Sequence, residues 1–218
     1  MVDEAAAATE PELCIPFHLQ PKRLFCVGDP LQMPATVLSR RAIDLGLSQS
    51  LHERLMYHCD FDHVMLDVQY RMNPEISYFP SQNFYKSKIQ NGPNVEAVDY
   101  RKPPFVLDGR PYVFLNAVGG EEQGAGGSYR NLAEAKTIVS LVEQLRNRAM
   151  ASNKPGPWHS TDRIRIITFY QGQVGLLKRL LRDRGFGDRV VVATVDSSQG
   201  CEADIVLVSF VRSPRRDG

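Results

Sequence analysis

Short apolar runs recur along the chain, and most are rich in β-branched or aromatic residues. They predict strands at 23–29, 64–70, 112–118, 163–170, 189–196 and 203–211. The runs at 23–29, 163–170 and 203–211 are the strongest, because they are apolar at successive positions rather than at alternate ones. That pattern is typical of parallel strands that helices cover on both faces.

Between these runs, apolar residues recur at helical spacing. They predict helices over 46–59, 74–85, 131–150 and 171–185. The clearest is 131–150, whose apolar stripe consists of Ile138, Val139, Leu141, Val142 and Leu145. Strands that alternate with helices predict an α/β architecture. Two polar stretches, 119–128 and 151–162, predict loops.

The composition narrows the class of protein. A chain of 218 residues forms one large domain or two small ones. No run approaches 18 apolar residues, so we expect no membrane-spanning helix. The four cysteines are scattered without a C-x-x-C pair, and the acidic first residues do not resemble a secretion signal. We therefore expect a nuclear or cytoplasmic location.

Two acidic residues, Asp3 and Glu4, open the chain within MVDEAAAATE. One interpretation is an alanine-rich tail or helix, and the other is a metal site at the end of a short strand. A second polar segment, VGDPLQMPAT, follows the predicted strand at 23–29 and puts Gln32 on a loop between two prolines. Because α/β proteins bind ligands at the carboxyl ends of strands, Gln32 either contacts a phosphate or orients a water, or it belongs to a plain turn.

A third segment, VQYRMNPEISYFPSQNFY, spans 68–85. Asn73 followed by Pro74 predicts the start of a helix. Just before it, Arg71 is suited to bidentate contact with a phosphate, and Tyr70 offers a face for stacking on a base. The alternative is a surface Tyr-Arg pair at a turn.

A fourth segment, TVDSSQGCEADIVLVSFVRS, begins at Thr194. Thr194 and Ser197 provide hydroxyl groups, and Gly200 allows the backbone to approach a ligand closely. Glu202 precedes the last predicted strand. A loop of this kind binds phosphates through N–H and O–H donors, or it forms a structural turn.

Taken in order, VDEAAAATEPEL, VGDPLQMPAT, QYRMNP, ITFYQGQ and TVDSSQGCEADIVLVS resemble motifs II to V of superfamily 1 helicases. The resemblance is to the branch that contains the nonsense-mediated-decay RNA helicase and senataxin. It covers nearly the whole chain and favours the metal-site interpretation of the acidic pair.

This resemblance implies a P-loop NTPase helicase core, with RecA-like parallel sheets flanked by helices and truncated at both ends. Residues 1–67 would be the C-terminal part of the first RecA-like domain. Residues 68–218 would be the second RecA-like domain without its C-terminal end. The cofactors would be ATP and Mg²⁺, and the partner would be single-stranded RNA or DNA.

The resemblance also implies roles for individual residues. Asp3 would hold Mg²⁺, and Glu4 would polarise the attacking water. Gln32 would sense the γ-phosphate, and Arg71 would reach the same group as an arginine finger. Tyr70 would stack on the adenine or ribose. Gly200 and Glu202 would close over the ribose and phosphate. Thr194 and Ser197 would contact the nucleic-acid backbone. Tyr170 and Gln173, in ITFYQGQ, would face the nucleic-acid strand or structure the loop.

The 218 residues contain no G-x-x-x-x-G-K-[ST] loop. We therefore expect that the chain alone hydrolyses ATP poorly or not at all, and that helicase segments upstream and downstream are missing from it. The function predicted is a fragment of an ATP-dependent RNA or DNA helicase. The alternative is a catalytically inactive nucleic-acid-binding or scaffold module derived from one. The sequence leaves the choice between RNA and DNA open.

Overall fold

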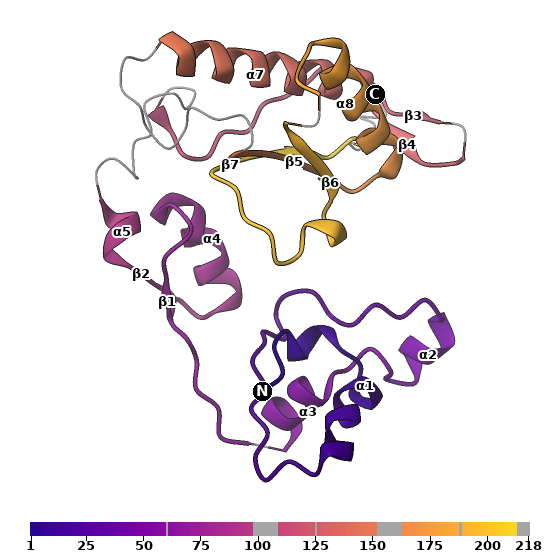
Figure 1. Cartoon of the computed structure of the whole chain (residues 1–218), viewed down its shortest axis with the longest axis vertical. Helices are drawn as coiled ribbons and strands as arrows, with labels where there is room; N and C mark the ends of the chain where they lie inside the picture. Colours follow the sequence, from indigo (N-terminus) through magenta and orange to yellow (C-terminus); the bar gives the residue numbers. More distant parts are fainter. Residues whose placement is uncertain (60, 98–108, 125, 152–162, 188, 213–218) are drawn as a thin grey trace, which may run out of the picture. The chain divides into compact units, whose positions relative to one another are not determined.

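The computed structural model describes residues 1–59, 61–97, 109–124, 126–151, 163–187 and 189–212. The chain divides into two compact units, Met1–Arg101 and Lys102–Gly218 (Figure 1). The boundary between these units differs from the one predicted between RecA-like domains at 1–67 and 68–218. The predicted domain boundary stays a prediction. No helix within the described residues is long and apolar enough to cross a membrane.

The second unit is built on a three-stranded parallel sheet in the order β6-β5-β7. Its strands are β5 (Ile164–Thr168), β6 (Val191–Thr194) and β7 (Ile205–Ser209). Two long helices, α7 (Leu132–Ala151) and α8 (Gln171–Asp183), lie on one side of this sheet (Figure 1). The arrangement confirms the α/β architecture, with a parallel sheet and helices that follow the predicted ranges closely.

The core of this unit lies between the sheet and the two helices. It contains most of the predicted stripe of α7, the inward positions of β5 and β6, and the buried face of α8; its members include Ala135, Ile138, Val139, Val142, Ile164, Ile166, Val174, Leu177, Leu181 and Val192. Burial of these side chains at roughly 25 cal/mol per Å² of apolar surface stabilises the unit.

The opposite face of the sheet is more open than the sequence predicts. Along β7 the burial alternates, and the side chains of Val206 and Val208 are 47% and 43% exposed. The prediction that this run is covered on both faces is therefore wrong for the described residues. Successive side chains of a strand point to opposite faces of the sheet. An unbroken apolar run can therefore have only one of its two faces covered.

A buried amide ties the ends of α7, α8 and β7 together. The side chain of Gln173 is fully buried, and its Oε1 accepts a hydrogen bond from the backbone N–H of Asn131 at 2.8 Å. Its Nε2 donates to the carbonyl of Asn131 and to the hydroxyl of Ser209. That hydroxyl in turn donates to Glu134 at 2.6 Å. Every polar atom of the Gln173 side chain is thus paired, as a buried amide requires.

Two sequence predictions for this unit are wrong. No strand forms over 112–118, where Phe114 and Val118 are 70% and 91% exposed. Conversely, the predicted loop at 119–128 contains β3 (Glu122–Gln123), which pairs antiparallel with β4 (Tyr129–Arg130). The ion pair between Glu122 and Arg130, 2.8 Å apart, stabilises this ribbon. Nearly all of the other predicted loop, 151–162, lies outside the described residues.

The first unit contains short elements joined by extended segments. They are η1 (Ala5–Ala7), α1 (Glu10–Cys14), η2 (Ile15–Leu19), α2 (Arg40–Asp44), α3 (Leu51–His58), β1 (Val68–Gln69), α4 (Pro74–Phe84), β2 (Gln90–Asn91) and α5 (Pro93–Glu96). Helix α4 matches its predicted range, and Asn73 caps it by accepting from the N–H of Glu75. Helix α3 begins later than predicted because Ser50 caps it, accepting from the N–H of Glu53.

Neither predicted strand of this unit forms in full. The run 23–29 makes one parallel bridge, between Cys26 and Val2. Two backbone hydrogen bonds flank that bridge, and both use Val2, with Phe25 and Val27 as partners. The run 64–70 shortens to β1, which pairs in parallel with β2. An apolar run becomes a strand only where a neighbouring backbone is available to pair with it.

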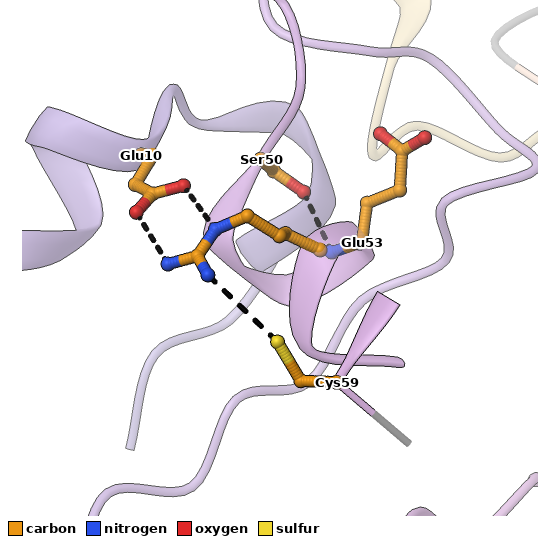
Figure 2. A network of polar contacts seen from close by, with 5 residues as sticks. Glu10, Ser50, Glu53 and Cys59 are labelled. Carbon is orange, nitrogen blue, oxygen red and sulfur yellow. Dashed lines mark hydrogen bonds and ion pairs between the residues drawn. The ribbon is translucent and has the colours of Figure 1, made fainter. Parts of the chain in front are cut away.

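An ion pair joins α1 to α3. Arg54 donates to the two carboxylate oxygens of Glu10 at 2.8 and 2.6 Å, in a bidentate arrangement. Figure 2 shows Glu10 facing this guanidinium, with Cys59 on its other side. The hydrogen bond from Arg54 lowers the pKa of Glu10. The pair links residues 44 positions apart, which local sequence patterns do not predict.

We expect Gln173→Ala to destabilise the second unit by roughly 2–4 kcal/mol, because it leaves the N–H of Asn131 and the hydroxyl of Ser209 with fewer partners. Hydrogen exchange of the α8 amides in the 218-residue chain measures the change. Gln171→Ala, an exposed position on the same helix, is the matched control. Equal protection in both variants would contradict the role given to the buried amide.

The ion pair also makes stability depend on pH. Because the folded pKa of Glu10 is lowered, its contribution is present above the unfolded value of about 4.3 and is lost as pH falls through the folded pKa. We expect Glu10→Gln to lower the melting temperature at neutral pH and to match the unsubstituted chain in acid. Glu53→Gln serves as control. A pH-independent difference for Glu10→Gln would rule out the ion pair as its cause.

Candidate nucleotide and nucleic-acid site

The two segments that carry the acidic pair and the predicted sensor glutamine lie against each other. The backbone N–H of Ala5 donates to the carbonyl of Val27 at 2.8 Å. A Cβ at Gly28 would come within 2.8 Å of the backbone nitrogen of Ala6 and 2.9 Å of that of Ala5. Only glycine allows this approach. The structure therefore explains why a glycine occupies position 28, which the sequence alone did not reveal.

Asp3 and Glu4 occupy the turn just before this contact. Glu4 has φ of 51°, in the left-handed region that few non-glycine residues adopt. Its N–H donates to Oδ1 of Asp3 at 3.0 Å, and both side chains are exposed. Unusual backbone at a position of this kind is common in functional sites, where the surrounding structure holds it. Exposed carboxylate oxygens are the ligands that Mg²⁺ prefers, so Asp3 fits the predicted metal role.

The carboxylate of Asp29 organises the loop that carries Gln32. Its Oδ1 accepts from the N–H of Leu31 at 2.9 Å, which closes a local turn. Its Oδ2 accepts from Nε2 of Gln32 at 2.9 Å and from the hydroxyl of Tyr85 at 2.6 Å. Gln32 is therefore held by a neighbour in the same loop, and that neighbour is held by a residue 56 positions away.

The surroundings of this loop shift the pKa values of two nearby side chains, Tyr85 and His52. Burial, together with its hydrogen bond to Asp29, raises the pKa of Tyr85 to about 12. Burial also lowers the pKa of His52, and the negative charge of Asp29 opposes that shift. Tyr85 is thus a neutral hydrogen-bond donor at any physiological pH.

Tyr70 and Arg71 lie in the turn between β1 and α4, and Gln69 shapes this turn. Oε1 of Gln69 accepts from the N–H groups of Arg71 and Met72, and its Nε2 donates to the carbonyl of Met72 and to Asn91. Both side chains of the predicted pair, Tyr70 and Arg71, are exposed. The turn is rigid because one amide satisfies several backbone groups in it.

The ring of Tyr70 rests on a glycine. A Cβ at Gly92 would come within 2.4 Å of two ring carbons of Tyr70, so any other residue at this position would displace the ring. The carbonyl of Tyr70 accepts from Nδ2 of Asn94 at 2.7 Å, which fixes the backbone. Tyr70 remains 60% exposed, which leaves ring surface available for stacking.

In the second unit, Thr194 and Ser197 form one small network at the carboxyl end of β6. Their hydroxyl oxygens are 2.9 Å apart, and Oγ of Ser197 also accepts from the N–H of Thr194. Thr194 is buried, whereas Ser197 is exposed on η5 (Asp196–Ser198). Of the two predicted residues, Ser197 is the one with access to a ligand, and Thr194 orients it.

Tyr170 emerges at the same edge of the sheet. Thr168 pairs with Thr194 in the register of β5 and β6, so the residues that follow both strands lie at one edge. The ring of Tyr170 packs edge-on against Tyr129, with centroids 5.7 Å apart. Arg212 lies 4.5 Å above the ring of Tyr129. A hydrogen bond with Tyr170 contributes most to raising the pKa of Arg212. These contacts favour the second of the two roles predicted for Tyr170, that of structuring its loop.

Gly200 and Glu202 lie in the loop between η5 and β7. Gly200 has φ of 71°, and the space around its Cα is open. Glu202 is exposed. The loop is anchored at its far end by an ion pair between Asp204 and Arg163. Burial raises the pKa of Asp204, and the charge of Arg163 opposes this shift.

The predicted site residues therefore form two groups. Within the first unit, the acidic pair and the Gln32 loop lie side by side, and the Tyr70–Arg71 turn leads into α4, whose end reaches Asp29. Within the second unit, the other predicted residues gather at or beyond the carboxyl ends of β5 and β6. The described residues contain no cluster of three or more His, Cys, Asp or Glu side chains arranged to hold a metal by themselves. Asp3 would hold Mg²⁺ jointly with phosphate oxygens and water, as is usual for this ion.

Sequence reasoning missed several residues that build these groups. Asp29 carried a signal, since an Asp before a turn commonly bonds to the backbone two residues later. Gly28 and Gly92 also lay beside singled-out residues. Tyr85 carried no local signal, because its partner is distant in sequence.

Comparisons with known proteins identify the family of this chain. A family model described as an AAA domain matches residues 47–218, and a second model of the same description matches residues 1–40. The chain is 39% identical to the regulator of nonsense transcripts 1 homolog of Drosophila melanogaster. It is 35% identical to helicase sen1 of Schizosaccharomyces pombe and 37% identical to the ATP-dependent helicase NAM7 of Saccharomyces cerevisiae.

The chain belongs to the superfamily 1 helicases. The matches place it in the branch of Sen1 and the regulators of nonsense transcripts, and they confirm both the resemblance and the fold class predicted from the motifs. The three alignments cover 98% to 100% of the chain. They cover only 13% of helicase sen1, 18% of the Drosophila protein and 22% of NAM7. The activity of the whole protein is therefore a matter for proposal.

We expect Gly28→Ala to destabilise the first unit by roughly 1–3 kcal/mol, because its Cβ would meet two backbone nitrogens that no rotamer change can move. Urea unfolding of the 218-residue chain measures the loss. Gly120→Ala, where a Cβ has nothing within 4 Å, is the control. Equal stability of the two variants would show that the backbones are farther apart than described.

Proposed function

We propose that this helicase-family chain supplies the part of an ATP-dependent helicase that runs from the Mg²⁺-binding aspartate to the phosphate and nucleic-acid loops of the second RecA-like domain. The observation that carries the proposal is the packing of the acidic pair against the Gln32 loop. The exposed carboxylate pair directly precedes one of these packed segments, and the amide held by Asp29 directly follows the other, which supports a shared site.

ATP with Mg²⁺ is the ligand that suits this site. Asp3 would bind the ion, and Glu4 would take a proton from or polarise the attacking water. Gln32 would contact the γ-phosphate or that water through its amide. Arg71 would stabilise the charge that spreads over the γ-phosphate oxygens, and Tyr70 would stack on the adenine or ribose.

Single-stranded RNA or DNA is the proposed partner of the second unit. Ser197, oriented by Thr194, would donate to a phosphate of the strand, and Tyr170 would stand beside it. Gly200 and Glu202 would close over the ribose and phosphates of the nucleotide. ATP-driven opening and closing of the helicase core would then move the strand.

The test uses the complete coding sequence that contains these residues, expressed and assayed for ATP hydrolysis with and without single-stranded RNA and DNA. We expect nucleic acid to stimulate hydrolysis. We expect Arg71→Ala to reduce kcat by roughly 10³-fold, because it removes the group that neutralises transition-state charge. We expect Glu4→Gln to reduce kcat by about 10²-fold or more.

Arg179→Ala is the matched control, since this arginine is exposed on α8 and is not one of the predicted site residues. It should leave hydrolysis unchanged. Binding of nucleic acid without any ATP hydrolysis would overturn the proposed activity and indicate an inactive binding module. Equal loss in Arg71→Ala and Arg179→Ala would overturn the role of Arg71.

A further inference from the structure

The side chain of Tyr85 joins the end of α4 to the loop that carries Gln32. Tyr85 ends α4, and its hydroxyl donates to Oδ2 of Asp29 at 2.6 Å. The distance is that of a strong hydrogen bond to a charged acceptor. Tyr85 is half-buried, so the contact is shielded from water on part of its surface.

The oxygen that Tyr85 binds is the one that holds Gln32. Nε2 of Gln32 donates to Oδ2 of Asp29 at 2.9 Å, and Oδ1 of Asp29 is engaged by the N–H of Leu31. A direct hydrogen bond between the side chains of Gln32 and Tyr85 adds to this arrangement and opposes the rise in the pKa of Tyr85. The carbonyl oxygen of Gln32 would then be available to orient a water. Fixing the carboxylate of Asp29 therefore fixes the amide of Gln32.

The other end of α4 begins beside the proposed arginine finger. Arg71 lies two residues before Asn73, which caps the helix. The 11 residues of this helix span about 16 Å. Tyr85 and Arg71 are therefore carried at the two ends of one helix, and one of these ends contacts the Gln32 loop.

We propose that Tyr85 is a positioning residue for ATP hydrolysis, which holds Gln32 in place through Asp29 and links the Gln32 loop to the helix that begins beside Arg71. The inference rests on the proposed function and names a residue for the same site. Because burial and Asp29 raise the pKa of Tyr85 to about 12, its hydroxyl keeps its proton and donates throughout the working range of pH.

The experiment compares Tyr85→Phe with the unsubstituted protein, expressed from the complete coding sequence, in nucleic-acid-stimulated ATP hydrolysis. Phenylalanine keeps the ring and removes only the hydroxyl. We expect kcat to fall about 10-fold with little change in KM for ATP, since a displaced Gln32 affects orientation in the transition state more than binding. Tyr78→Phe, at an exposed tyrosine of the same helix, should leave kcat unchanged.

A double-mutant cycle with Asp29→Asn separates positioning from general destabilisation. If Tyr85 acts through Asp29, the double variant should be little slower than Asp29→Asn alone, while melting temperatures of Tyr85→Phe and Tyr78→Phe stay close. Additive losses would overturn the inference, as would an unchanged kcat for Tyr85→Phe in an enzyme that hydrolyses ATP. Absence of hydrolysis in the unsubstituted protein would instead overturn the proposed function and this inference together.

Discussion

A close approach of two backbones, at Gly28 and at Ala5–Ala6, underlies the candidate ATP site. A side chain at Gly28 would collide with peptide nitrogens, and larger residues in place of the buried alanines would push the segments apart. The approach brings the backbone that follows the carboxylate pair next to the backbone that precedes the Gln32 loop. Small residues here are a geometric requirement rather than a filler.

In the second unit, hydrogen bonds of a buried amide hold distant segments together. The amide of Gln173 pairs with the backbone where α7 begins and with the last residue of β7, so helices and sheet are fixed at the edge where the candidate nucleic-acid residues emerge. Apolar packing resists displacement but tolerates sliding, whereas a fully paired amide specifies one arrangement. The edge that carries Ser197 is held by this pairing as well as by the core beneath it.

The long helices could be predicted because their apolar residues recur with a period that only a helix matches. Ile138, Val139 and Val142 of the stripe on α7 are buried as their spacing predicted, and β5 and β6 lie where β-branched residues are densest. The strand predicted over 112–118 failed because an apolar run specifies burial only when a backbone partner is available. The motifs located the candidate residues, Gln173 among them. The partners of Tyr85 and Gln173, however, lie on distant segments, and no local pattern encodes such contacts.

The order of the sheet has a consequence for how the second unit is made. Its central strand, β5, pairs with two strands that follow it, and Ile164 meets Ile205 only after α8, β6 and η5 have been completed. Pairings this distant in sequence require long loops to close, which slows folding. During synthesis β5 therefore leaves the ribosome before either of its partners. For that interval its open edges are a point at which a chaperone or another nascent chain can bind.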